Sequence, residues 1–157
     1  MKTLVTYYSR SGITKKIALL ISKKIKSDSD EIIDKKDRSG AIGWIFAGKD
    51  ATQKKLTTIT HKKDPKNYDL IIIGGPVWSW NVTPAIRTYV KDNEKSLKSR
   101  RVAFFATQGS SGAETKFKSM QEIIGKKPVA TLIINGKDIR DESYKKKIDG
   151  FAKAIRN

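Results

Sequence analysis

Short apolar runs alternate along the chain with longer segments whose hydrophobic residues recur every three or four positions. Runs such as Leu4–Tyr8 and Leu70–Gly74 are largely apolar at successive positions, as expected for parallel strands that are buried on both faces. The segments between them show the spacing of amphipathic helices, with Ile17, Ala18 and Ile21 as an example. This alternation predicts an α/β fold in which a parallel sheet lies between two layers of helices.

The patterns predict five strands and about five helices, with no linker and no internal repeat. Residues 1–157 are therefore expected to form a single doubly wound domain. Helices are expected at residues 14–26 and 41–53, after Thr83-Pro84, after Ser111 and over about 144–155, with Trp44 as a packing residue of the second. The strands are expected at Leu4–Tyr8, Glu31–Asp34 (near an edge), Leu70–Gly74, Val102–Ala106 and Val129–Ile134.

Composition excludes several kinds of site. The chain has no cysteine, which rules out disulfides, thiolate catalysis, iron–sulfur ligation and cysteine-based zinc sites. Its single histidine, His61, lies in a polar run and is expected in a solvated loop, so no metal site is expected. No apolar stretch approaches the roughly 20 residues that cross a bilayer, and no signal peptide is evident. These features favour a cytoplasmic protein.

Positive charge is in large excess: 33 Lys+Arg against 16 Asp+Glu give a net charge of +17. Such a field suits an acidic protein, nucleic acid or an anionic membrane surface. The basic residues are spread over many short pairs, and no arginine-rich arm, zinc finger or aromatic RNA-binding motif accompanies them. Nucleic acid is therefore a disfavoured partner, and lysines that solubilise helix faces are the plainer interpretation.

Three short loops directly follow predicted strands. They are residues 9–14 after the first strand, residues 75–81 after the third and residues 107–112 after the fourth. The carboxyl ends of parallel strands meet at one edge of a sheet, so the loops are expected to lie together. The first is rich in hydroxyl groups, the second contains two tryptophans and the third has small polar residues. The combination predicts a phosphate site, an aromatic platform and an opposing wall.

The first loop has the chemistry of an anion site. It joins a strand to a helix N-terminus, where free amides and the helix dipole favour a negative group. Ser9, Ser11 and Thr14 supply hydroxyl groups, and Gly12 allows close approach to the backbone. The spacings of a nucleoside-triphosphate loop and of a dinucleotide-binding turn are both absent, so a phosphomonoester is the expected ligand. A simple Ser/Gly turn with a helix cap is the alternative.

The second loop places Trp78 and Trp80 on either side of Ser79, in a segment expected to be irregular. Exposed indoles are costly unless they cover something, and stacking on a flat ring contributes roughly 0.5–1.5 kcal/mol beyond area burial. The alternation indicates that one tryptophan faces a ligand while the other packs or shields its edge. Packing of both tryptophans on neighbouring helices is the alternative.

The three loops resemble those of the flavodoxin family, through Ser-x-Ser-Gly-x-Thr at 9–14, Gly-Gly-Pro-Val-Trp at 74–78 and Thr-Gln-Gly-Ser-Ser-Gly at 107–112. The resemblance covers essentially the whole chain, whose length is similar to that of the short-chain members. It implies a five-stranded parallel sheet in the order 2-1-3-4-5, a three-layer α/β/α sandwich and bound FMN, with Trp78 or Trp80 stacked on the flavin ring. The cofactor-binding residues that it implies are Ser9, Arg10, Ser11, Gly12, Ile13, Thr14, Pro76, Val77, Trp78, Ser79, Trp80, Asn81, Thr107, Gln108, Gly109 and Gly112.

Two departures from the family pattern bear on function. Many flavodoxins have an aromatic residue in the third loop, where this chain has Gln108 and Ser110, so one face of the flavin is expected to be more open. The electron carriers of the family are usually acidic, whereas this chain is basic. Arg10, Lys15 and Arg87, if near the pocket, would stabilise an anionic reduced flavin, which predicts a less negative final reduction potential than is usual.

The leading hypothesis is an FMN-binding electron carrier between a reductase and a redox acceptor, with no catalytic acid or base of its own and with acidic protein partners. The alternative is an FMN-dependent oxidoreductase that uses NAD(P)H or a quinone, which steady turnover of NAD(P)H would reveal. A phosphoacceptor domain is disfavoured, because the strand ends at Tyr7-Tyr8 and Gly74-Gly75 lack the required carboxylates.

Overall fold

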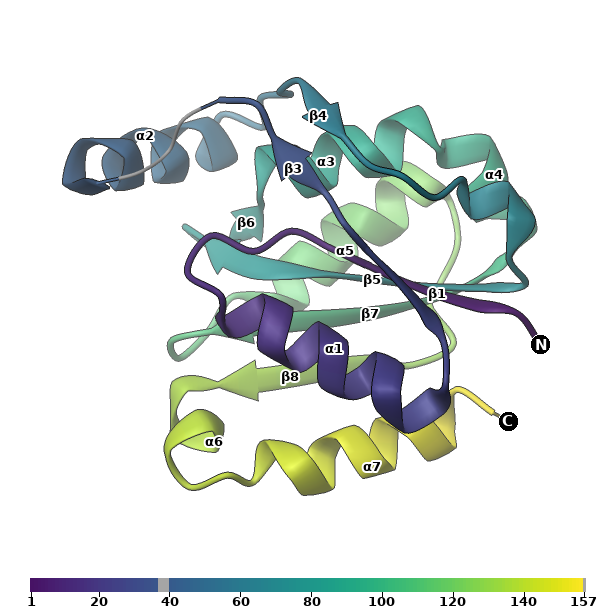
Figure 1. Cartoon of the computed structure of the whole chain (residues 1–157). Coiled ribbons are helices and arrows are strands. Elements are labelled where there is room, and N and C mark those ends of the chain that lie inside the picture. The colour runs from purple at the N-terminus through teal and green to yellow at the C-terminus, as the bar shows by residue number, and fades with distance from the viewer. Residues whose placement is uncertain (37–39, 157) are drawn as a thin grey trace.

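Five parallel strands form a central sheet, and helices cover both of its faces (Figure 1). The computed structural model describes residues 1–36 and 40–156. The strands lie in the order β2-β1-β5-β7-β8, so the predicted doubly wound order is confirmed. The five strands are β1 (Thr3–Tyr7), β2 (Asp28–Glu31), β5 (Leu70–Trp78), β7 (Arg101–Gln108) and β8 (Thr131–Asn135).

The helices form a layer on each side of the sheet. Helices α1 and α7 cover one face, and α3, α4 and α5 cover the other, while α2 extends beyond the strand ends (Figure 1). Within the described ranges, no helix combines the length and the apolar character needed to span a membrane. The helices are α1 (Ile13–Ile25), α2 (Gly40–Thr52), α3 (Pro84–Asp92), α4 (Glu94–Ser99), α5 (Ala113–Ile124), α6 (Gly136–Arg140) and α7 (Tyr144–Ala154), with a 3-10 turn, η1, at Pro65–Asn67.

Strand β5 is the centre of the core. It pairs in parallel with β1 on one side and with β7 on the other. Its residues alternate between the two helical layers, so that Ile71 and Ile73 face the α3–α5 layer while Leu70 and Ile72 face the α1–α7 layer. All four side chains are fully buried. The continuous apolar run in the sequence therefore reflects burial on both faces of the sheet.

The second strand lies at the sheet edge, as predicted, but its boundaries were predicted wrongly. Strand β2 spans Asp28–Glu31, whereas Ile33–Asp34 forms a separate strand, β3, antiparallel to β4 (Ile59–Thr60). The segment Asp28–Glu31 is entirely polar, so its hydrophobic pattern gave no strand signal. The carboxylate of Asp30 is buried in this strand. The cost of its burial is offset because it accepts hydrogen bonds from the backbone amides of Lys62 and Lys63.

Helix α2 was predicted correctly, but three of its large apolar residues do not enter the core. Ile42, Ile45 and Phe46 are exposed, while Ala47 and Ala51 are buried. The side chain of Trp44 lies outside the described part of the structure. The helix therefore presents an apolar surface to solvent at the edge of the molecule where β5 ends.

We expect the substitution Gly74→Ala to destabilise the fold, because the added Cβ would lie 1.9 Å from Cε1 of Phe105 on the neighbouring strand. Crowding of this kind typically costs about 1–3 kcal/mol, sometimes more. Urea denaturation measures the change in the free energy of unfolding. The control is Gly150→Ala in α7, where a Cβ meets nothing within 4 Å and the higher helix propensity of alanine is expected to be neutral or stabilising. Equal effects of the two substitutions would contradict the contact with Phe105.

Candidate functional site

A cavity of about 370 Å³ opens at the carboxyl ends of the parallel strands. Residues from all three predicted loops line it, because register places the loops at one level of the sheet; Pro76 of β5, for example, is paired with Thr107 of β7. The segment after β8 contributes two further residues. The lining residues are Arg10, Ser11, Ile13, Thr14, Pro76, Val77, Trp78, Thr107, Gln108, Gly109, Gly136 and Ile139.

The other predicted site residues support these loops. Ser9 caps α1, because its Oγ accepts hydrogen bonds from the backbone amides of Gly12 (3.2 Å) and Lys15 (3.1 Å). Gly12 has a φ of 92°, in the left-handed region that favours glycine. Asn81 donates a side-chain hydrogen bond to the carbonyl oxygen of Ser79 at 3.0 Å. These residues thus shape the loops, although they do not line the cavity.

One of the hydroxyl groups that the sequence suggested as donors at the N-terminus of α1 also has a partner inside the protein. The Thr14 hydroxyl is buried and lies 2.7 Å from the hydroxyl of Thr107, so it ties the first loop to the third. The backbone amides of Ile13 and Thr14 begin the helix and have no hydrogen-bond acceptor within the described residues. With Ser11 and Arg10 at the same cavity, these amides leave the helix N-terminus ready for an anion.

The positive groups named from the sequence have different environments. Arg10 lines the cavity, whereas Lys15 forms an ion pair with Glu31 at 2.7 Å, and the hydrogen bond and charge of Glu31 raise the pKa of Lys15. Arg87 is buried on α3 and is not among the residues that line the cavity. Burial lowers the pKa of Arg87. Arg10 is therefore the cation of this group that adjoins the cavity.

The second loop is a tight hairpin, not the irregular segment expected. Strand β6 (Asn81–Val82) turns back antiparallel to the end of β5, with Val77 opposite Val82 and Trp78 opposite Asn81. The two turn residues, Ser79 and Trp80, both have positive φ, at 47° and 57°. A two-residue turn with this backbone matches the twist of the strands but normally uses Asn or Gly. The sequence therefore lacked the usual hairpin signal.

The two tryptophans have different surroundings. Trp78 lines the cavity and meets the ring of Tyr8 edge to face, with 5.6 Å between ring centroids. Trp80 is 62% exposed, and its indole N–H donates to Oγ of Ser111 at 3.0 Å. Trp80 thus covers the third loop from outside, while Trp78 forms part of the cavity wall.

The third loop is braced by its own glutamine. The side chain of Gln108 accepts a hydrogen bond from the backbone amide of Ala113 and donates one to Oδ1 of Asn135, both at 2.8 Å. Next to it, the carbonyl oxygen of Gly109 accepts a bond from the amide of Gly136. These contacts bring the β8–α6 connection to the cavity. Sequence reasoning missed this fourth segment, although its position after the fifth strand was a signal.

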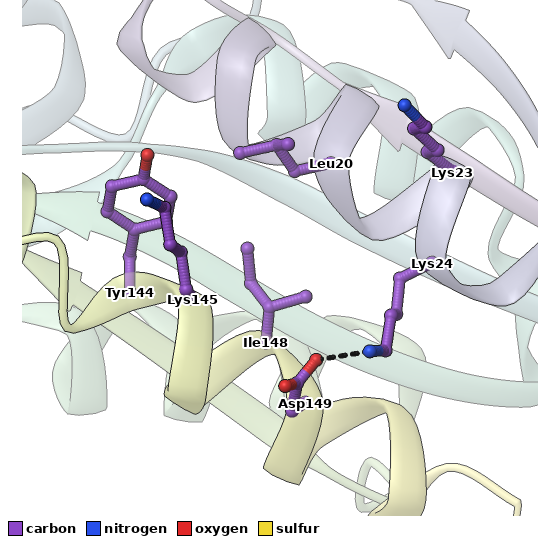
Figure 2. Close-up of a pocket in the computed structure, with 7 residues that line it drawn as sticks. All are labelled: Leu20, Lys23, Lys24, Tyr144, Lys145, Ile148 and Asp149. Atoms are coloured by element: carbon purple, nitrogen blue, oxygen red, sulfur yellow. Dashed lines mark ion pairs between the residues drawn. The ribbon is translucent and has the colours of Figure 1, made fainter.

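Other hollows in the described part of the structure lie outside this cavity, two of them beside helices α2 and α7. One, of about 330 Å³, lies between α2 and the β5–β6 hairpin and shares Val77 and Trp78 with the first cavity. The other lies between α1 and α7, where Leu20 faces Tyr144 and Ile148 and an ion pair joins Lys24 to Asp149 (Figure 2). It contains none of the predicted site residues. Of these two hollows, the one beside α2 adjoins the candidate site.

Comparison with known families agrees with this geometry. The family model described as a flavodoxin domain matches residues 44–145, which is more than half of the chain. The chain belongs to the flavodoxin family. The matched flavodoxin region includes the second and third loops and the β8–α6 connection. A search of curated proteins by sequence finds no match.

Solved flavodoxin-like structures share the fold. A flavoprotein from Lactobacillus acidophilus, crystallised in complex with FMN, is 29% identical, with a TM-score of 0.67 over 90% of this chain and 98% of that one. Oxidised flavodoxin 2 from Bacillus cereus is 22% identical, with a TM-score of 0.59 over 99% and 98% of the two chains. Oxidised flavodoxin 1 from the same organism is 18% identical, with a TM-score of 0.58 over 99% of both. The two Bacillus likenesses bear on the fold alone.

We expect Gly112→Ala to disturb the junction between the hairpin and the third loop. Gly112 has a φ of 106°, and an added Cβ would lie 2.8 Å from both Trp80 Cδ1 and Val77 Cγ1. The substitution is predicted to shift tryptophan fluorescence and to lower the unfolding free energy by about 1–3 kcal/mol. Gly109→Ala in the same loop is the control, because a Cβ there meets nothing within 4 Å. Matching spectra for the two variants would argue against this packing.

Proposed function

We propose that this flavodoxin binds FMN in the 370 Å³ cavity and carries electrons between a reductase and a redox acceptor. The observation that carries the proposal is the meeting, in one cavity, of an aromatic wall with a helix N-terminus whose first two amides have no acceptor within the described residues. The FMN-bound Lactobacillus flavoprotein supports it as a relative of the same fold. Bound FMN supplies the redox chemistry, and the chain supplies binding, orientation and access.

The phosphate fits the first loop. The amides of Ile13 and Thr14 have no acceptor within the described residues, and they lie at the positive end of the α1 dipole. Arg10 and Ser11 add a cation and a hydroxyl at the same cavity. The lysine of a nucleoside-triphosphate loop is absent, which agrees with a monophosphate ligand. In this proposal Ser9, Gly12 and the Thr14 hydroxyl hold the loop in shape.

The flavin ring fits between the second and third loops. Trp78, Pro76 and Val77 form one wall, and Gln108 and Gly109 form the other. Trp78 is the tryptophan that we assign to the ring, since Trp80 faces the outer side of the third loop. Neither Gln108 nor Gly109 is aromatic, so they leave that side of the ring more accessible than an aromatic residue would. The backbone groups of both loops are available to the polar edge of the ring.

The surroundings of the cavity suit docking of an acidic protein. Exposed apolar side chains lie around it: Ile13 at the first loop, Trp80 at the hairpin and Ile45 on α2. The net charge of +17 steers negatively charged partners toward the molecule. We therefore propose acidic redox proteins as partners, whose rate of association falls as salt screens the attraction.

We expect purified protein to bind FMN with one-to-one stoichiometry and to bind riboflavin at least about tenfold more weakly, since riboflavin lacks the phosphate. Ser11→Asp places a negative charge at the phosphate loop and should weaken FMN binding far more than riboflavin binding. Flavin fluorescence titration measures both affinities. The control, Ser110→Asp, adds the same charge to the exposed third loop. Failure of the wild-type protein to bind FMN at micromolar concentration would refute the proposal.

A second candidate function is an FMN-dependent NAD(P)H:quinone-type oxidoreductase. The specific observation in its favour is the 330 Å³ hollow beside α2, which shares Val77 and Trp78 with the 370 Å³ cavity and is large enough for a flat apolar acceptor. Thr52 is exposed and lines this hollow, so Thr52→Phe should obstruct it without touching the FMN cavity.

The two functions differ in turnover. If the protein is an oxidoreductase, we expect the FMN-loaded protein to oxidise NADPH steadily in the presence of a soluble benzoquinone. Thr52→Phe should then lower this rate and leave the FMN affinity unchanged. For the electron carrier, NADPH is consumed only when a reductase is added. Absorbance at the NADPH band distinguishes the two outcomes, with Thr52→Ser as the conservative control.

A further inference from the structure

Lys116 is a lysine whose whole side chain is buried behind the cavity wall. It lies in the first turn of α5, and its exposed fraction is 0%. Its Nζ donates hydrogen bonds to the backbone carbonyl oxygens of Gly75 and Pro76, the latter at 3.3 Å. Pro76 itself lines the 370 Å³ cavity. The lysine nitrogen is therefore separated from the cavity by a single layer of backbone.

No carboxylate neutralises this ammonium group within the described residues. Its Nζ contacts backbone carbonyls of β5, and the apolar Ile86 of α3 packs on the same Gly75 backbone. The helices α3, α4 and α5 carry other charged residues, of which Arg87 is buried and the rest are exposed: Glu114, Lys118 and Glu122 on α5, Arg87, Lys91 and Asp92 on α3, and Glu94, Lys95 and Lys98 on α4. Desolvation by burial lowers the pKa of Lys116 to about 7. The group thus changes charge near neutral pH.

The loss of the proton leaves the hydrogen bonds of Lys116 largely intact. An ammonium group has three N–H donors and a neutral amine has two, which is enough for the two carbonyl oxygens that it contacts. Titration therefore changes the charge behind the cavity wall more than the shape of that wall. An isolated charge in a poorly solvated place acts strongly on its surroundings.

We propose that Lys116 is a positioning residue, which fixes the Gly75–Pro76 backbone of the cavity wall and places behind it a positive charge that can be switched on or off by pH. The part that concerns the cofactor rests on the proposed function. Two-electron reduction with the uptake of one proton adds a negative charge to FMN, the electrons coming from an external reductant. A cation behind the wall stabilises that charge, so protonated Lys116 raises the reduction potential of bound FMN.

The first test needs no cofactor and measures stability against pH in the wild type, Lys116→Met and Lys118→Met. Because the pKa of Lys116 is lower in the folded protein than its ordinary value of 10.5, the unfolded chain binds more protons between these two pKa values. The contribution of Lys116 to stability is therefore most unfavourable below about pH 7 and improves as the pH rises toward about 10. Lys116→Met should lose this rise, while Lys118→Met on the exposed side of the same helix should keep it. If the stability of Lys116→Met changed with pH in parallel with that of the wild type, the proposal that Lys116 carries a buried charge would be refuted.

The second test measures the midpoint potential of bound FMN by anaerobic titration with dithionite at about pH 6 and about pH 9. Below neutral pH the wild-type potential should exceed that of Lys116→Met, and the difference should shrink at the higher pH. Lys116→Arg, whose charge persists throughout this range, should keep the higher potential at both. His61→Asn removes the only histidine and should leave the pattern unchanged. A difference that does not vary with pH would overturn the charge switch. If the wild type binds no FMN, the proposed function fails, but the stability test still decides the state of Lys116.

Discussion

The pairing of β5 with β1 on one side and β7 on the other fixes the position of everything that surrounds the cavity. Tyr7 is paired with Gly74, Gly74 with Phe105, and Pro76 with Thr107, so the three strands end at nearly the same level. Because the strands are parallel, the loop that leaves each of them starts at the same edge of the sheet. An anion site, an aromatic wall and an opposing loop from distant parts of the sequence are thereby brought together. A slip in the register of β5 would separate them.

The end of β5 is shaped from behind by the residues packed against it. The absence of a side chain at Gly74 makes room for the ring of Phe105, and the absence of one at Gly75 lets Ile86 and Lys116 approach the backbone. The wall of the cavity is thus the outer surface of a close-packed core, which holds it more rigidly than a free loop would be held. Changes in the core on the α3–α5 side therefore reach the cavity directly.

The sequence predicted the α/β fold and the three loops because long apolar runs and hydroxyl- or glycine-rich turns have strong local signals, whereas the sheet order followed from the resemblance of the loops to the flavodoxin family. It did not predict contacts that depend on distant partners. The hydroxyl of Thr14, for example, contacts that of Thr107 on another strand, which no local pattern indicates. The hairpin at Trp80 was missed because neither of its turn residues is Asn or Gly, and Gly136 was missed because its place at the cavity depends on the pairing of β8 with β7. The roles of the candidate site residues toward FMN remain predictions.

The positive charges of the chain do not act equally on the cavity, since each contributes according to its distance, its pairing and its solvation. Lys15 is partly neutralised by Glu31, and Arg87 is buried away from the cavity lining. Exposed lysines elsewhere are screened by water and salt, so they steer partners at long range rather than adjust the cofactor. Among the described residues, Arg10 lines the cavity and Lys116 lies behind its wall, so both are in position to influence a bound flavin. The expected rise in reduction potential is therefore assigned to cations close to the cavity rather than to the net charge of +17.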